Sequence, residues 1–233
     1  MRLFSAFAND VRYQVKYGFY FIYALITALY IVILFIIPVE YKKTVASVII
    51  LTDPAMLGTF FIGGIWLLEK GEGLHNYWGI SPLRPVEYIL SKAVSLSVIS
   101  TLAAGLIVFI GFKKQADYLI LCISVFIGSM VFTSFGLWIA SYARSVNHYM
   151  IIVTPLEIFI SLPPILEAFG LSLPFFDVLP GVALWRMIGH SIGINSGETI
   201  WLYIILILWL GIALLLTTKR IPVTMQTEGG ERS

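Results

Sequence analysis

The chain has 233 residues, of which 59% are hydrophobic and 12% are charged, and its mean hydropathy is +0.92. Soluble domains carry about 25% charged residues, so this composition excludes a soluble globular domain and indicates a protein embedded in lipid. The net charge of +2 and the absence of basic runs longer than two residues argue against a nucleic-acid partner. The single cysteine, Cys122, forms no internal disulfide, and no Cys/His spacing typical of a metal site is present.

Residues 1–18 predict an amphipathic helix. Its apolar side chains recur at helical spacing, and its charged side chains face elsewhere. The apolar set is Phe4, Phe7, Ala8, Val11 and Val15, and the charged set is Arg2, Asp10, Arg12 and Lys16. Such a helix lies in the membrane interface rather than crossing the bilayer. The alternative is a plain extension next to the first span.

Apolar stretches of about 20 residues predict six transmembrane helices. They cover residues 19–37, 44–68, 93–112 and 118–142, a fifth span that starts near 149, and 199–217. The first stretch is longer than the apolar region of a signal peptide and has no cleavage site after it, so it is a retained span. The expected fold class is an all-α integral membrane protein. Residues 1–223 form one transmembrane domain, and residues 224–233 form a disordered cytoplasmic tail.

The fifth span contains Pro155, Pro163 and Pro164. Proline lacks a backbone donor and clashes with the preceding turn, so this helix is expected to kink and to end early. Residues 165–198 are moderately apolar and rich in proline and glycine. They predict short re-entrant helices in the outer half of the bilayer, buried against protein or lining a cavity, because lipid offers no hydrogen bonds to irregular backbone.

Six spans place both termini on the same side of the membrane, and the positive-inside rule selects the side. With cytoplasmic termini, ten basic residues lie inside and five lie outside. The inner set is Arg2, Arg12, Lys16, Lys70, Arg84, Lys92, Arg144, Lys219, Arg220 and Arg232, and the outer set is Lys42, Lys43, Lys113, Lys114 and Arg186. The chain is therefore expected to be a multi-pass protein of the cell membrane with both termini in the cytoplasm.

The first cytoplasmic loop, residues 69–92, contains the most informative pattern. It leaves the membrane with acidic residues and glycines, after which Leu74, Tyr77 and Trp78 share one helical face, and Pro82 and Pro85 end the helix. An exposed aromatic face is suited to docking another protein. The same residues also suit an interfacial helix with its aromatic rings among lipid headgroups, and the pattern alone favours neither reading.

The order Glu-Lys-Gly-Glu-Gly-Leu at 69–74, Ser-Pro-Leu at 81–83 and Glu-Tyr-Ile-Leu-Ser-Lys at 87–92 resembles the permeases of type-two ATP-binding-cassette (ABC) exporters. The N-terminal helix, the six spans and the broken outer helices fit the same layout. The stretches 14–20, 179–180 and 184–186 are similar to fluoroquinolone-export permease subunits.

The resemblance implies a permease subunit that moves a small hydrophobic, drug-like compound out of the cell, with a lipid or a peptide as the alternative cargo. The loop would hold a coupling helix that docks on a separate ABC ATPase subunit, and a second permease copy or sister permease would complete the transporter. The implied coupling residues are Glu69, Glu72, Gly73, Leu74, Tyr77, Trp78, Ser81, Pro82 and Leu83. Gly71 and Gly73 bracket Glu72 where the family often has a longer charged run, which leaves open which carboxylate makes the contact.

The chain has no G-x-x-x-x-G-K-[ST] pattern, so it is expected to bind no cofactor itself. ATP and Mg²⁺ would bind to the partner ATPase. The expected role is therefore that of a non-catalytic subunit, and no residue is assigned to catalysis or to a metal.

Two acids fall within predicted spans, Asp53 in the second and Glu157 in the fifth. A carboxylate at mid-membrane costs about 2.5–3.5 kcal/mol on insertion scales, so each acid needs a partner, a wet cavity or a proton. One interpretation places both acids on the substrate path, where they attract a cationic group. The alternative makes Asp53 a partner at a helix kink and Glu157 a protonated hydrogen bonder between helices.

Residues 189–193 spell Gly-His-Ser-Ile-Gly, the G-x-S-x-G pattern of serine hydrolases. That chemistry needs the serine on a strand-to-helix turn, and no strand is expected before it. An intramembrane enzyme and a non-transporting membrane scaffold remain the alternatives to a permease.

Overall fold

A computed structural model describes residues 2–75, 84–113, 116–194 and 199–230, and the regular structure in these ranges is entirely helical. The elements follow one another as α1 (Arg2–Lys16), α2 (Phe19–Ile36), α3 (Val39–Ile50), η1 (Leu51–Ala55), α4 (Leu57–Gly71), α6 (Pro85–Phe112), α7 (Tyr118–Ala140), α8 (Val146–Ala168), η3 (Pro174–Val178), α9 (Pro180–Ser191) and α10 (Thr199–Gly230). This confirms the all-α fold class.

Six helical segments of the described residues are long and apolar enough to cross a membrane, as the sequence predicts. They are Phe19–Ile36, Val39–Gly71, Pro85–Phe112, Tyr118–Ala140, Val146–Ala168 and Thr199–Thr224. The second segment combines α3, the π-helix η1 and α4. The connection between the second and third spans is shorter than the predicted loop 69–92, because α4 runs to Gly71 and α6 starts at Pro85. Proline suits the first helical position, and the Arg84 N–H donates to the Glu87 carboxylate at 2.8 Å.

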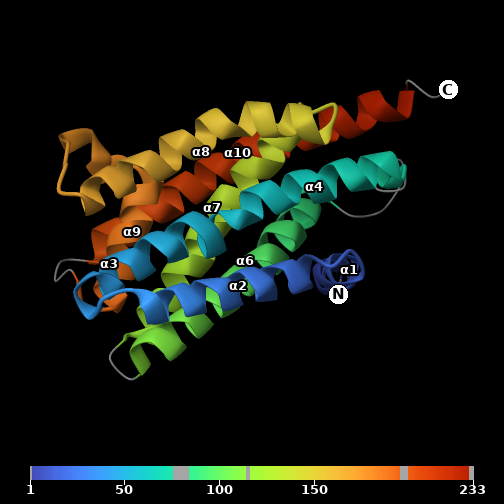
Figure 1. Cartoon of the computed structure of the whole chain (residues 1–233). Coiled ribbons are helices and arrows are strands. Elements are labelled where there is room, and N and C mark those ends of the chain that lie inside the picture. Colours follow the sequence, from blue (N-terminus) through green and yellow to red (C-terminus); the bar gives the residue numbers. More distant parts are fainter. Residues whose placement is uncertain (1, 76–83, 114–115, 195–198, 231–233) are drawn as a thin grey trace.

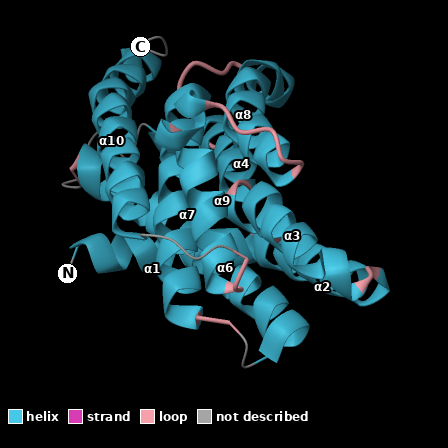
Figure 2. Cartoon of the chain, turned by 90° about the vertical axis from the view of Figure 1, so that its left-hand side faces the viewer, coloured by secondary structure: helices cyan, strands magenta, loops and turns pink. Residues whose placement is uncertain are grey.

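Helix α7 lies in the middle of the bundle and packs against α4, α6, α9 and α10 (Figure 2). Small residues allow these close approaches. A Cβ atom at Gly136 would lie 2.8 Å from Ile62 and Thr59 of α4, and one at Gly128 would lie 2.5 Å from Leu184 of α9. The outer faces of α2 and α10 are covered with exposed apolar side chains, which is typical of lipid-facing helices.

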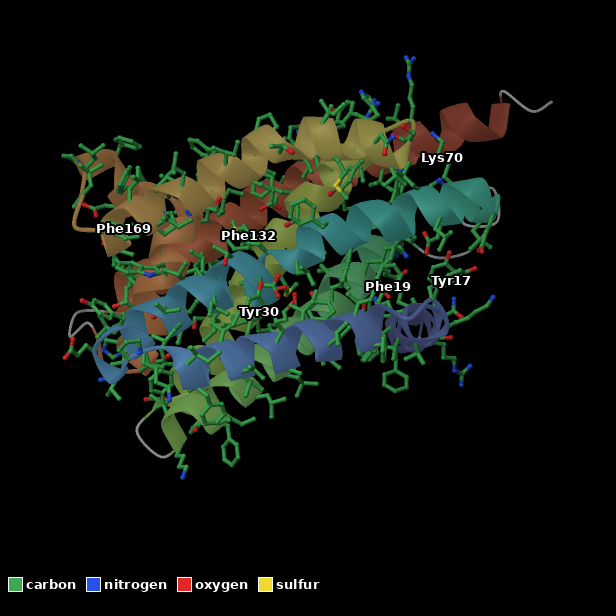
Figure 3. The ribbon with its side chains drawn as sticks, in the orientation of Figure 1. Tyr17, Phe19, Tyr30, Lys70, Phe132 and Phe169 are labelled. Carbon is green, nitrogen blue, oxygen red and sulfur yellow. The ribbon has the colours of Figure 1, made fainter. Side chains whose placement is uncertain are left out.

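The two ends of the bundle carry different segments (Figure 1). Helix α1, the end of α4, the turn between α7 and α8, and the last turns of α10 lie at one end, which we call the α1 end. The turn between α2 and α3, the connection from α6 to α7, and η3 lie at the opposite end. Figure 3 shows Tyr17 and Lys70 at the α1 end and Phe169 far from them.

Helix α8 is continuous through its three prolines, so the expected early end of the fifth span is wrong. The prolines at 155, 163 and 164 leave three carbonyls without their usual helical donor. One of these, on Ile160, packs so closely on Gly181 of α9 that a Cβ atom there would lie 2.1 Å from its oxygen. Neighbouring helices hold α8 together where its own hydrogen-bond ladder is interrupted.

The segment between α8 and α10 contains the short helices η3 and α9, as expected, and α9 is almost entirely buried. It packs against α3, α7, α8 and α10. Arg186 of α9 binds both Glu167, at 2.7 Å, and Asp177, at 2.8 Å. The Asp117 N–H donates to the carbonyl of Ser191 at 2.7 Å. The backbone of α9 therefore lies against protein, as expected for this part of the segment, whereas most side chains of residues 169–178 are exposed.

The C-terminal segment differs from its prediction. The sequence places a disordered tail from residue 224, whereas α10 continues through Pro222 to Gly230. Ile221, directly before Pro222, and Thr224, two residues after it, are buried against the bundle. Packing against the bundle therefore maintains the helix past Pro222.

Candidate functional site

Three charged side chains from three helices meet inside the protein at the α1 end. Lys92 of α6 is 1% exposed, Glu69 of α4 is 2% exposed and Asp10 of α1 is 6% exposed. The Lys92 ammonium lies 3.0 Å from the Asp10 carboxylate and donates a second, short hydrogen bond to Glu69. We call these three residues the ion clamp. Because a buried ion needs partners, the clamp fixes the relative positions of α1, α4 and α6.

Further hydrogen bonds satisfy the clamp's remaining oxygen atoms. The Tyr88 hydroxyl donates to Glu69 Oε2 at 2.6 Å, and the Ser91 hydroxyl donates to the other oxygen of Asp10. The Lys92 ammonium also lies 4.7 Å from the centre of the Tyr88 ring. Every charge of the clamp therefore has more than one partner, which is the condition under which buried ionic networks are stable.

Helix α1 uses its polar stripe, not its apolar face, to contact the bundle. Ala6, Asp10 and Gln14 are buried, and the Gln14 amide donates to Ser95 of α6 at 2.7 Å. Phe4 is 75% exposed, and Val15 is also exposed. The sequence correctly separates Asp10 from the apolar residues but gives it no partner. An outward apolar face suits a helix in the membrane interface, which stays a prediction.

The start of the predicted coupling loop is bonded to α1 as well. The hydroxyls of Tyr13 and Tyr17 both donate to the exposed carboxylate of Glu72. Burial, followed by the nearby Glu72 charge, raises the pKa of Tyr13, so this hydroxyl stays a neutral donor. Gly73 follows α4 with a φ of 73°, a backbone conformation that other residues rarely adopt, and it turns the chain sharply out of the helix.

His75 completes this region. Its ring is buried and stacks on Trp66 with 4.1 Å between ring centres, and its Nε2 atom lies 4.0 Å from Glu69. The side chains at the beginning of the loop therefore fold back onto α4, so the clamp and the loop start form one connected unit.

The structure describes only part of the predicted coupling set. Glu69, Glu72, Gly73 and Leu74 are described, whereas Tyr77, Trp78, Ser81, Pro82 and Leu83 lie outside the described residues. The two candidate carboxylates differ clearly: Glu69 is turned inward to the clamp and Glu72 is exposed. Of the two carboxylates, only that of Glu72 is open to solvent.

Sequence reasoning assigned no role to Asp10 or Lys92. A signal existed for Lys92, because it comes directly before the apolar stretch 93–112 and an ammonium there needs a counter-ion. Nothing in the sequence says that the counter-ions come from residues 10 and 69. Tyr13, Tyr17 and Tyr88 were missed for the same reason.

The two acids within the spans lie apart from the clamp and do not act together. Asp53 lies in the π-helix η1, is half-buried, and lies beside Tyr30 of α2. Such π-helical turns occur frequently at functional sites. Glu157 of α8 lies beside Thr59 of α4. No interaction joins Asp53 to Glu157 in the described part of the chain, so the structure places them at two separate points.

The G-x-S-x-G pattern does not form a nucleophile elbow. Ser191 is the last residue of α9, is buried, and donates its hydroxyl to the carbonyl of Ile188 at 2.6 Å. The residues before it are helical, whereas the elbow requires a strand. This serine is therefore part of a helix end and not of a hydrolase site.

No family model matches the chain. Two relatives are similar to it, the fluoroquinolones export permease proteins of Mycobacterium tuberculosis strains CDC 1551 / Oshkosh and ATCC 25618 / H37Rv. Each is 25% identical over 171 residues, which cover 73% of this chain and 72% of the relative. With its six membrane-crossing helices, the chain is a multi-pass membrane protein that resembles, at a distance, the permeases of ABC exporters.

Proposed function

We propose that the chain is the permease subunit of an ABC exporter, which moves a small hydrophobic compound out of the cell. A separate ATPase subunit with bound ATP and Mg²⁺ would dock on loop 69–92, and a second permease copy or a sister permease would complete the pathway. The α1 end, with both termini, would face the cytoplasm. The observation that carries this proposal is the ion clamp at the base of the loop.

The clamp supports this function for a mechanical reason. A docked partner can move membrane helices only if the segment it pushes is firmly attached to them. The loop is continuous with α4 on one side and α6 on the other, and Glu69 and Lys92 join those two helices directly. Asp10 and the two tyrosines on Glu72 add α1 to the same unit. A displacement of the loop would therefore move three helices together.

The cargo class follows from the relatives' name and from the apolar bundle, and a lipid or a peptide is the alternative cargo. Asp53 and Glu157 would act on the translocation path at separate points. The chain itself would be a non-catalytic subunit, because the energy of transport would come from ATP hydrolysis on its partner.

Co-purification of an ATPase tests the proposal. The tagged chain is expressed in its own cell, solubilised in a mild detergent and purified, and the bound proteins are identified by mass spectrometry through a G-x-x-x-x-G-K-[ST] motif. We expect a bound ATPase that hydrolyses ATP, and we expect the double variant Leu74→Arg plus Trp78→Arg to lose it. Two arginines in an apolar docking face would have to be buried without charge partners when the ATPase binds, which disfavours the complex.

The matched control is Phe169→Arg plus Leu171→Arg. Both residues are apolar and exposed, and Phe169 lies at the opposite end of the bundle (Figure 3), so the control should retain the ATPase. The proposal is wrong if no ATPase accompanies the wild-type chain in several mild detergents, or if both double variants lose it equally.

A further inference from the structure

Glu157 is a buried acid that has no cation beside it among the residues that the structure describes. It lies in the middle of α8 and is 9% exposed, and its Oε1 atom accepts no hydrogen bond within the described ranges. Thr59 of α4 lies beside the carboxyl, and the Tyr149 hydroxyl is committed elsewhere, donating to the carbonyls of Thr59 at 2.5 Å and of Gly136 at 3.4 Å. The neighbours of Glu157 therefore do little to compensate a negative charge.

The elements that pack against α8 offer no charge partner either. Helix α7 has no charged residue between Tyr118 and Ala140. On α9, Arg186 is paired with Glu167 and Asp177, and the ring of His190 is in no ion pair with Glu157. On α4, Glu69 belongs to the ion clamp and Lys70 lies next to it at the helix end. On α3, Lys42 lies over the Phe35 ring and Lys43 donates to the Gly193 carbonyl, while Glu40 is an exposed acid.

The packing around this carboxyl is tight. A Cβ atom at Gly63 of α4 would lie 2.0 Å from the Tyr149 ring, and one at Gly58 would lie 2.3 Å from the hydroxyl of Thr133 on α7. Helices α4, α7 and α8 thus interlock on both sides of Thr59. A proton is the cation that can enter such packing without displacing a side chain.

We propose that Glu157 is a proton-binding site inside the membrane domain. The carboxyl holds a proton while it is buried between α8 and the facing part of α4. When the enclosure opens to water, the O–H bond of the carboxyl breaks, the proton passes to water, and a hydrated carboxylate remains. An isolated carboxylate in an apolar interior costs several kcal/mol, whereas the neutral acid needs only ordinary hydrogen bonds. The step thereby links proton release to a change in conformation.

The backbone hydrogen-bond ladder of α8 is interrupted on both sides of Glu157, although the helix itself is continuous. Pro155 precedes the acid by two residues, and Pro163 and Pro164 follow it within two turns. Each proline removes one backbone hydrogen bond, so residues 156–162 have fewer backbone hydrogen bonds to the rest of α8 than the same segment of an unbroken ladder. Movement of this segment away from α4 would expose the carboxyl. A link between this movement and transport rests on the proposed function, whereas proton binding by Glu157 does not.

Infrared spectroscopy of the purified chain in lipid tests the proton directly. A protonated carboxyl has a carbonyl band that a carboxylate lacks. We expect this band at neutral pH in the wild-type chain and its loss in Glu157→Gln, which keeps the size of the side chain. Asp53→Asn is the control, and it should leave the Glu157 band unchanged. A wild-type spectrum identical to that of Glu157→Gln in this region would overturn the proposal.

Carbodiimide labelling serves as the second measurement and uses only the wild-type chain, so a variant that fails to fold does not affect it. Carbodiimides add to protonated carboxyls, and a lipid-soluble reagent reaches the membrane interior whereas a water-soluble one does not. We expect Glu157 to react with the former only. Labelling of Glu157 by the water-soluble reagent would show that the carboxyl is open to water, and a lack of labelling by the lipid-soluble reagent would show that it holds no proton; either result would contradict the inference. Neither experiment involves an ATPase, so its failure is distinct from failure of the co-purification test.

Discussion

Buried acids occur in two regions of this molecule, and the two regions differ in how they compensate the negative charge of a buried carboxylate. At the α1 end, Asp10 and Glu69 share the ammonium of Lys92 and receive hydrogen bonds from Ser91 and Tyr88. In the interior of the bundle, Glu157 has no cation in the described part of the chain. A charge can be kept in the first region, whereas the second region favours the neutral acid.

The difference assigns different tasks to the two regions. Paired charges from three helices hold those helices in one arrangement, and breaking the set is costly. A lone acid can change its charge by losing a proton to water, so it responds to opening and closing of its surroundings. The α1 end is therefore suited to transmitting a displacement, and the α4–α8 region is suited to sensing one.

Removing the shared cation should have the largest effect. Lys92→Met leaves Asp10 and Glu69 buried together without a counter-ion, and loss of one partner of a buried pair costs about 3–5 kcal/mol. We expect a large fall in the temperature of thermal unfolding in detergent, or loss of folded protein. Lys219→Met removes an exposed lysine from the same end of the molecule and should change little. Equal behaviour of the two variants would show that the clamp is not a stabilising unit.

A methyl group between α4 and α8 should have the next largest effect. In Gly63→Ala the new atom would lie 2.0 Å from the ring of Tyr149, which is buried and fixed by its hydroxyl bonds. Overpacking of this kind costs about 1–3 kcal/mol. Gly64→Ala is the matched control, because a Cβ atom there meets nothing within 4 Å. Thermal unfolding should separate the two variants, and a stable Gly63→Ala protein would argue against the tight α4–α8 interface.

Freeing the start of the loop should have a smaller, local effect. Tyr13→Phe plus Tyr17→Phe removes the two hydrogen bonds to Glu72 and leaves the clamp intact. Hydrogen bonds contribute about 0.5–1.5 kcal/mol each, and less where water competes, so global stability should fall only slightly. We expect faster amide hydrogen exchange in residues 69–75 with no change in α7. Unchanged exchange in these residues would mean that the tyrosines do not order the loop start.

The smallest change in stability should follow from Asp53→Asn. Asparagine has nearly the same size and can still accept a hydrogen bond from the neighbouring Tyr30 hydroxyl, so we expect a change of no more than about 1 kcal/mol in the free energy of unfolding. Transport of a fluorescent hydrophobic compound by the assembled exporter then measures the role of the charge. Unchanged transport in the double variant Asp53→Asn plus Glu157→Gln would exclude a charge role for both acids.

Much of the fold could be predicted from the sequence, because the length and hydropathy of a span are local properties. Six apolar stretches predicted six spans, and all six are found. The errors fall where neighbouring helices override a local signal. Three prolines suggested an early end for α8, yet this helix is continuous, and α10 extends into the tail that was expected to be disordered from residue 224.

The candidate site was less predictable. The loop motif pointed to residues 69–83, and it selected Glu69 and Glu72 without distinguishing them. Their distinction depends on helices far away in the sequence, since Lys92 turns Glu69 inward and the tyrosines of α1 hold Glu72 at the surface. A periodic pattern shows which face of a helix is polar, but it does not show what that face contacts.

The sequence by itself determined that the protein lies in lipid, that it is all-α and that it has six spans, because the free energy of moving a helix into lipid is a sum over its own residues. Only the tertiary structure decided how the charges are paired. Asp10, Glu69 and Lys92 are separated by up to 82 residues, and their meeting depends on how α1, α4 and α6 pack. The same packing left Glu157 enclosed without a cation, because the charge of a buried acid is governed by neighbours that no local pattern specifies.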